Sequence, residues 1–169
     1  MQVHRTVGCL QTHLELFAPI IRSGKDMSIR TLIIDHDPGV VELLGQLLRS
    51  QGFDVVTAAT GEEGLRLGRD FEPGIVILDL LLPDRDGWDM CMALRAFSDV
   101  PILALSAIDD PHVVASILDA GADDHLVKPV SSSVLVAHVH KLARRPHTAP
   151  GPRPWLHTPP QRPTAPLRA

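Results

Sequence analysis

The sequence predicts an α/β fold in which a five-stranded parallel sheet is covered by helices on both faces. Short apolar runs alternate along the chain with segments whose apolar residues recur at the helical period. The runs are continuously apolar, so strands formed from them must be buried on both faces, which is typical of parallel sheets. Capping and turn residues separate the runs from the helical segments.

The first half of this pattern contains three strands and two helices. The strands are expected over residues 31–34, 55–58 and 75–78, each a short run of apolar residues. Asp37 is typical of an N-cap and Pro38 of a first helical position, so a helix begins there. Thr60 and Glu63 match a capping box, which starts a second helix that ends near Phe71.

The second half continues the alternation to a final helix. We expect a helix over 88–96, a strand over 100–105, a helix from 111 to 121, a strand over 125–127 and a helix over 132–144. Asp110 opens the second of these helices, Gly121 stops it, and Ser131 caps the last one. We expect a solvated loop at Asp84, Asp86 and Asp89, with Pro83 and Gly87 shaping the turn.

Charge divides the chain into parts. Between residues 28 and 143 there are eighteen acids and eight bases, whereas residues 144–169 hold five arginines, no acid and eight of the fifteen prolines. We therefore expect one domain over residues 28–145, an N-terminal extension over residues 1–27, and a disordered Pro/Arg-rich tail over residues 146–169.

Composition excludes several classes of function. The acidic domain repels a phosphate backbone, so direct nucleic-acid binding by the folded part is excluded. No apolar run reaches the ~18 residues that a membrane-spanning helix needs. The two cysteines cannot form a disulfide framework, which is typical of a reducing compartment, and we expect a cytoplasmic protein.

Polar residues follow the ends of four predicted strands: Asp35, Asp79, Ser106 and Lys128. The carboxyl ends of parallel strands meet at one edge, where open α/β sheets bind ligands. Carboxylates hold a divalent cation, an ammonium group neutralises phosphoryl oxygens, and a hydroxyl donates a hydrogen bond to one of them. A carboxylate is also a nucleophile that forms an aspartyl phosphate. The pattern predicts a site for a divalent cation and a phosphoryl group.

Four segments around these residues resemble the receiver domain of bacterial two-component response regulators, in order and in spacing. They are LIIDHDP from Leu32, IVILDLLLPDRDG from Ile75, PILALSA from Pro101 and GADDHLVKP from Gly121. The resemblance covers residues 29–145. It is closest to the class that carries a winged-helix DNA-binding domain, for which too few residues follow Arg145.

The resemblance implies a flavodoxin-like, doubly wound sheet of order 2-1-3-4-5 flanked by five helices. It implies that Asp79 accepts a phosphoryl group from a sensor histidine kinase or a phosphotransfer protein. Lys128 would pair with that group, and Ser106 and His125 would be switch residues. The resemblance also implies a cis bond between Lys128 and Pro129.

The resemblance further implies a Mg²⁺ ion held by Asp35, Asp79 and the backbone carbonyl of Leu81. The chain would be a signalling module and not an enzyme. It would contact a downstream protein target, with a homodimer through the last two helices as a further expectation.

Histidines replace the family's usual residues at several positions. His36 stands where a second acid is the usual direct Mg²⁺ ligand, and imidazole is a poor ligand for that ion. His125 stands at the position of the switch aromatic, where a histidine is either a pH-sensitive switch or a passive surface residue. His138 and His140 stand where arginines usually pair across a dimer face.

Three hypotheses remain open. The first is a stand-alone receiver that is phosphorylated on Asp79 and signals by phosphorylation-dependent protein contacts. The second is a pseudo-receiver that, because of His36, does not use Mg²⁺-dependent phosphorylation and is a constitutive interaction module. The third is a haloacid-dehalogenase-like phosphatase, to which the pair Asp35 and Asp37 is similar. Gly39 and the absence of room for a cap domain count against it.

Overall fold

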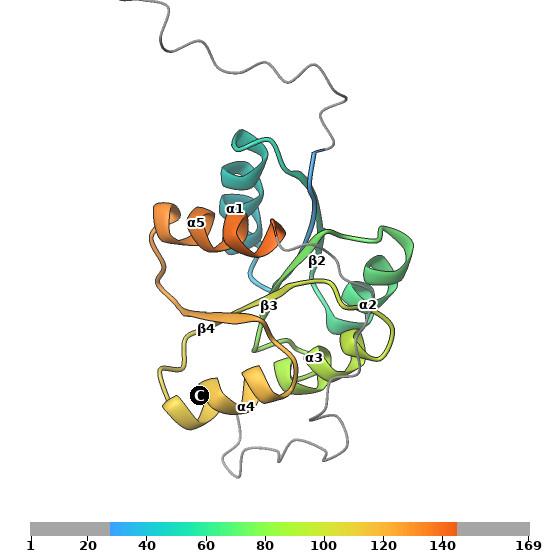
Figure 1. The fold of residues 1–169 in the computed structure, drawn as a ribbon, viewed down its shortest axis with the longest axis vertical. Helices are drawn as coiled ribbons and strands as arrows, with labels where there is room; N and C mark the ends of the chain where they lie inside the picture. Colours follow the sequence, from blue (N-terminus) through green and yellow to red (C-terminus); the bar gives the residue numbers. More distant parts are fainter. Residues whose placement is uncertain (1–27, 145–169) are drawn as a thin grey trace, which may run out of the picture.

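The computed structural model describes residues 28–144, so the predictions for residues 1–27 and 146–169 lie outside the described residues. Strands and helices alternate throughout this part (Figure 1). The elements are β1 (Arg30–Ile34), α1 (Pro38–Ser50), β2 (Asp54–Ala58), α2 (Gly61–Asp70), β3 (Ile75–Asp79), α3 (Gly87–Arg95), β4 (Ile102–Ser106), α4 (Pro111–Asp119), β5 (Asp124–Val127) and α5 (Ser132–Ala143). Each predicted element is present, with bounds that differ by one or two residues. Within these residues, no helix combines the length and apolar character that a membrane span requires.

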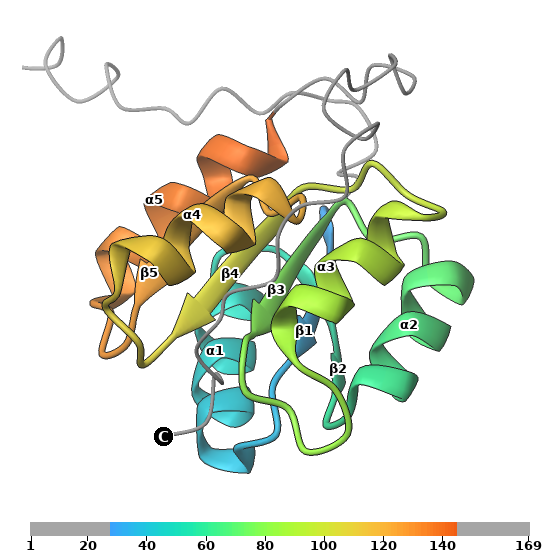
Figure 2. The ribbon, with the colours of Figure 1, turned by 90° about the horizontal axis from the view of Figure 1, so that it is seen from below.

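The strands form one parallel sheet in the order β2-β1-β3-β4-β5, which confirms the expected topology. α1 and α5 cover one face, and α2, α3 and α4 cover the other (Figures 1 and 2). The strand order reverses between β1 and β3, because β2 lies on one side of β1 whereas β3, β4 and β5 follow on the other side. Such a switch point leaves a crevice at the carboxyl ends of the strands.

Two hydrophobic clusters fill the two interfaces between sheet and helices. Side chains of a strand alternate between the faces, so Leu32 and Ile34 join the cluster under α2, α3 and α4, while Ile33 joins the cluster under α1 and α5. All three are fully buried. Burial on both faces is the physical reason for the continuously apolar strands.

The predicted N-caps are present, and each accepts a hydrogen bond from a backbone N–H of the first turn. They are Asp37, Thr60, Asp110 and Ser131. The capping box at α2 differs from the usual form in one hydrogen bond, because the Glu63 carboxylate accepts from the N–H of Ala59, at 3.1 Å. That donor lies one residue before the cap, whereas the usual box returns to the cap itself.

Candidate functional site

Two carboxylates lie side by side at the carboxyl edge of the sheet. Asp35 follows β1 and Asp79 ends β3, and these strands are neighbours, with Ile34 in register with Leu78. Both are buried, with 1% and 3% of their surface exposed. Two carboxylates removed from water in this way require a compensating positive charge or a hydrogen-bond donor.

Lys128 supplies that charge. Its Nζ lies 2.7 Å from Oδ2 of Asp35 and 3.2 Å from Oδ1 of Asp79. The backbone places it there, because the N–H of Lys128 donates to the carbonyl of Ser106 at the end of β4. The bond between Lys128 and Pro129 is cis, as expected. One cation therefore faces two anions, and the three groups carry a net negative charge.

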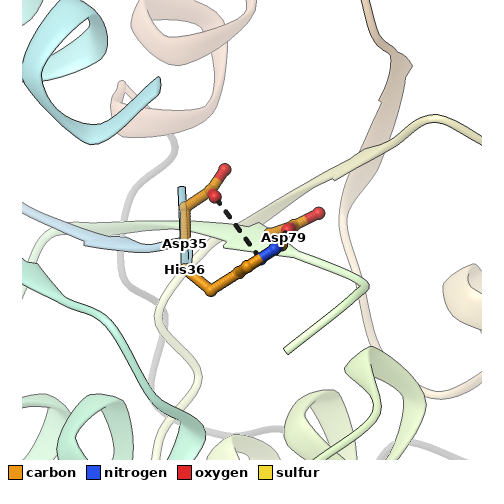
Figure 3. Close-up of side chains that lie close together, drawn as sticks. All are labelled: Asp35, His36 and Asp79. Atoms are coloured by element: carbon orange, nitrogen blue, oxygen red, sulfur yellow. Dashed lines mark hydrogen bonds and ion pairs between the residues drawn. The ribbon is translucent and has the colours of Figure 1, made fainter. Parts of the chain in front are cut away.

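His36 also faces the carboxylates (Figure 3). Its Nδ1 lies 3.2 Å from Oδ2 of Asp79 and 3.9 Å from Oδ1 of Asp35, and half of the side chain is exposed. Among residues 28–144, these three residues form the group of His, Cys, Asp and Glu side chains whose donor atoms lie close enough to share a metal ion. Two of the donors fit the Mg²⁺ that the resemblance implies, because they are carboxylates. The third does not, because Mg²⁺ prefers oxygen to imidazole nitrogen.

The two expected switch residues lie on neighbouring strands. Ser106 ends β4, is fully buried, and its Oγ accepts a hydrogen bond from the N–H of Ile108 at 2.9 Å. His125 on β5 is in register with Ala104 of β4. Its Nε2 is buried without a hydrogen-bond partner. Burial lowers the pKa of the His125 ring, although the negative charge of Asp124 acts to raise it.

The loop between β3 and α3 is exposed at Asp84, as expected, and half-buried at Asp86. The structure adds that both carboxylates accept hydrogen bonds from helix N-termini. Asp84 accepts from the N–H groups of Gly61 and Glu62 at the start of α2, at 2.8 and 3.0 Å, and these bonds lower its pKa. Asp86 caps α3 through the N–H of Asp89.

The cap by Asp84 bridges 23 positions in the sequence, so no local signal at α2 indicates it. Its effect is to tie the loop that carries Leu81, whose carbonyl is the third expected cation ligand, to the neighbouring helix. Leu81 also forms an isolated bridge with Asp86.

The last helix forms a second polar cluster with β5, around the carboxylate of Asp124. Nδ1 of His138 lies 2.9 Å from Oδ2 of Asp124, and Nζ of Lys141 lies 3.1 Å from the same oxygen. His140 instead packs its ring against Phe53, at a centroid separation of 5.1 Å. The two histidines thus have different neighbours, in agreement with their spacing of two on a helix.

The comparisons with known proteins agree with this arrangement. A family model described as the response regulator receiver domain matches residues 31–140. The DNA-binding response regulator MtrA of Mycolicibacterium smegmatis is 42% identical over 119 residues, which are 70% of this chain and 52% of that protein. The transcriptional regulatory protein AfsQ1 of Streptomyces coelicolor is 40% identical over 114 residues, 68% of this chain and 51% of that protein. The chain thus spans about half the length of the curated relatives it matches.

Solved structures share the fold. A two-component response regulator from Clostridium difficile has a TM-score of 0.69 and 28% identity, covering 72% of this chain and 100% of that one. The BeF3-activated receiver domain of RstA from Klebsiella pneumoniae has a TM-score of 0.66 and 28% identity, covering 69% and 99%. The matched span, the strand order and the acidic site at the strand ends together show that this chain belongs to the response regulator receiver family.

Proposed function

We propose that this chain transmits a signal by phosphorylation of Asp79. The observation that carries the proposal is the buried Asp79 carboxylate at the end of β3, with the Lys128 ammonium 3.2 Å away. In a receiver domain this pair supplies a nucleophile and a counter-charge for the incoming phosphoryl group. The phosphoryl donor is a histidine of a sensor kinase or of a phosphotransfer protein.

The proposed reaction is a transfer between two side chains. An Asp79 carboxylate oxygen forms a bond to phosphorus while the phosphorus–nitrogen bond to the donor histidine breaks. Lys128 stabilises the oxygens of the transferred group by its charge. A divalent cation held by Asp35, Asp79 and the Leu81 carbonyl would neutralise the same oxygens, and Mg²⁺ is the ion that receiver domains bind in their acidic pocket.

The response then passes to a protein partner. Phosphorylation at this edge biases the equilibrium between two arrangements of the neighbouring elements, and Ser106 and His125 would couple them to the phosphoryl group. A downstream protein target, a homodimer through α4 and α5, stand-alone action and a cytoplasmic location all belong to this proposal. α4 and α5 each expose one large apolar side chain, Leu118 and Val134.

A phosphatase of the haloacid-dehalogenase type is not favoured. In that mechanism the second Asp of the motif must act as acid and base beside the nucleophile. Here the Asp37 carboxylate caps α1 through the N–H groups of Gly39 and Val40, at 2.8 and 3.3 Å. It is therefore engaged in holding the helix.

The test is to incubate the full chain with acetyl phosphate or a histidine kinase and a divalent cation, then to map any acid-stable, alkali-labile adduct. We expect an adduct on Asp79 that is absent from Asp79→Asn and retained in Asp37→Asn, the matched control. An absent adduct, with partner binding retained in Asp79→Asn, would favour the pseudo-receiver. An adduct on Asp35 with turnover of a phosphate ester would favour the phosphatase.

A further inference from the structure

We propose that His36 makes the acidic site selective for a late first-row divalent cation, with Zn²⁺ as the reference ion, over Mg²⁺. This inference concerns the metal preference of the proposed phosphorylation site and therefore rests on the proposed function. It follows from one position, where an imidazole nitrogen stands in place of an acid.

The imidazole already faces the position between the carboxylates. Nδ1 of His36 lies 3.2 Å from one oxygen of Asp79 and 3.9 Å from one oxygen of Asp35. Two ligand atoms that each lie about 2.1 Å from one Zn²⁺ are about 3.0 Å apart when the angle at the ion is a right angle. They are about 3.4 Å apart when that angle is tetrahedral. The separation from Asp79 falls in this range, the separation from Asp35 exceeds it by about 0.5 Å, and the donor atoms of all three residues lie within 4.8 Å of one another. The donor atoms must therefore move closer together to bind one ion, and the His36 side chain, which is half exposed, is the least confined of the three.

The charge of the site suits a divalent cation. Asp35 and Asp79 carry two negative charges, and Lys128 carries the positive charge in contact with both. The sum is one negative charge in a buried place, where a cation gains more than it would in water. Replacing the family's second acid by a neutral imidazole removes one negative charge and one oxygen ligand, and it adds a nitrogen ligand.

Replacing an acid by an imidazole has opposite effects on the affinity of the site for the two classes of ion. Mg²⁺ is a hard ion, dehydrates reluctantly and is bound through oxygen, so it loses a ligand. Imidazole is a preferred ligand of Zn²⁺ and of neighbouring ions such as Ni²⁺, and carboxylates complete such sites. One imidazole and two carboxylates provide three protein ligands, the number found in zinc sites that keep a position open.

The test is a calorimetric titration of the full chain with Zn²⁺ and, separately, with Mg²⁺, without a phosphoryl donor. We expect the wild type to bind Zn²⁺ more tightly than Mg²⁺. His36→Asp should weaken Zn²⁺ binding by at least about tenfold and strengthen Mg²⁺ binding. His36→Ala should weaken Zn²⁺ binding without strengthening Mg²⁺ binding. Circular dichroism verifies the fold of each variant.

The matched control is His112→Asn, because His112 is an exposed histidine in the first turn of α4. Zn²⁺ affinity that falls equally in this variant, or that is unchanged in His36→Asp and His36→Ala, would overturn the proposal. A second readout is the ¹⁵N resonance of the His36 ring, assigned by its absence from His36→Ala, which should shift when Zn²⁺ binds. A ring signal that stays unmoved at saturating Zn²⁺ would also overturn it.

The failure of this inference is distinguishable from the failure of the proposed function. Zn²⁺ selectivity that depends on His36, with no adduct on Asp79 under any cation, would overturn phosphorylation and leave the metal preference intact. An adduct on Asp79 that forms with Mg²⁺, together with Zn²⁺ affinity that does not depend on His36, would overturn the metal preference and leave phosphorylation intact.

Discussion

His125 illustrates how one partly buried side chain makes the stability of the domain depend on pH. Its Nε2 is buried without a partner, and burial lowers the pKa of the ring in the folded protein. In the unfolded chain the pKa returns to its ordinary value of about 6.5. As the pH falls through that value, the His125 ring of the unfolded chain binds a proton, whereas the ring in the folded protein stays neutral. The folded state therefore loses stability, until the pH also passes the lower pKa of the folded protein.

We therefore predict that His125→Phe reduces the loss of stability between pH 7.5 and pH 5.5. Phe supplies the aromatic side chain that the family usually has at this position, and it has no nitrogen to bury or to protonate. The measurement is the free energy of unfolding from urea titrations at the two pH values, with His112→Asn as the exposed control. An unchanged pH dependence in His125→Phe, or an equal change in the control, would contradict the assignment.

At the scale of elements, Arg95 joins α3 to the segments that enter β4 and β5. Its Nη2 lies 2.6 Å from Oδ2 of Asp123, and its other nitrogens donate to the carbonyls of Ser98, Val100 and Gly121. The same Asp123 oxygen accepts from the N–H of Ile102, the first residue of β4. The two charged side chains are 5% and 17% exposed, so this ion pair is largely removed from water.

We predict that Arg95→Met destabilises the domain by about 3 kcal/mol, because it leaves a buried carboxylate without its cation. The matched control is Arg66→Met, whose exposed ion pairs with Glu63 and Asp70 should be worth less than about 0.5 kcal/mol. Urea unfolding measures both. Adding Asp123→Asn to Arg95→Met should recover part of the loss. A double variant less stable than Arg95→Met alone would show that the buried charge is not the cause.

For the whole molecule, the parts that the sequence predicts are those with local signals. The strands follow from continuous apolar runs, and the caps at Asp37 and Thr60 follow from neighbouring residues. Contacts between distant positions have no such signal. The cap on α2 by Asp84 spans 23 positions, the pair of Arg95 with Asp123 spans 28, and the contact of His36 with Asp79 spans 43.

The residues of the candidate site could likewise be predicted from the sequence, whereas the direction of one of its side chains could not. Its residues Asp35, Asp79 and Lys128 could be selected because parallel strands bring their ends to one edge and because the motifs resemble a known family. The direction in which His36 points could not be inferred, since it depends on the packing of the loop after β1. The sequence showed that an imidazole replaced an acid. The structure adds that its Nδ1 faces both carboxylates.

The arrangement of the core leads to a prediction about the domain as a unit. Within the described residues, the members of the two hydrophobic clusters span residues 29 to 143 and cover both faces of the sheet. We therefore expect a fragment of residues 28–145 to unfold in urea in one transition, at the midpoint of the full chain. α5 should be indispensable, because it buries Leu135, Val139 and Leu142 almost completely. At about 1.5–3 kcal/mol for each such side chain, their loss is comparable with the about 5–15 kcal/mol that stabilises a domain.

A fragment of residues 28–131, which lacks α5, is therefore expected not to fold, and it serves as the matched control for the fragment of residues 28–145. Circular dichroism and urea titration distinguish the two. A markedly lower midpoint for residues 28–145 would show that the segments outside this range stabilise the fold. Cooperative unfolding of residues 28–131 would show that the α5 part of the cluster under α1 and α5 is not needed. α5 packs against the side of β3 and β4 opposite to α3 and α4, so its loss would leave the strands that carry Asp79 and Ser106 covered on one face only.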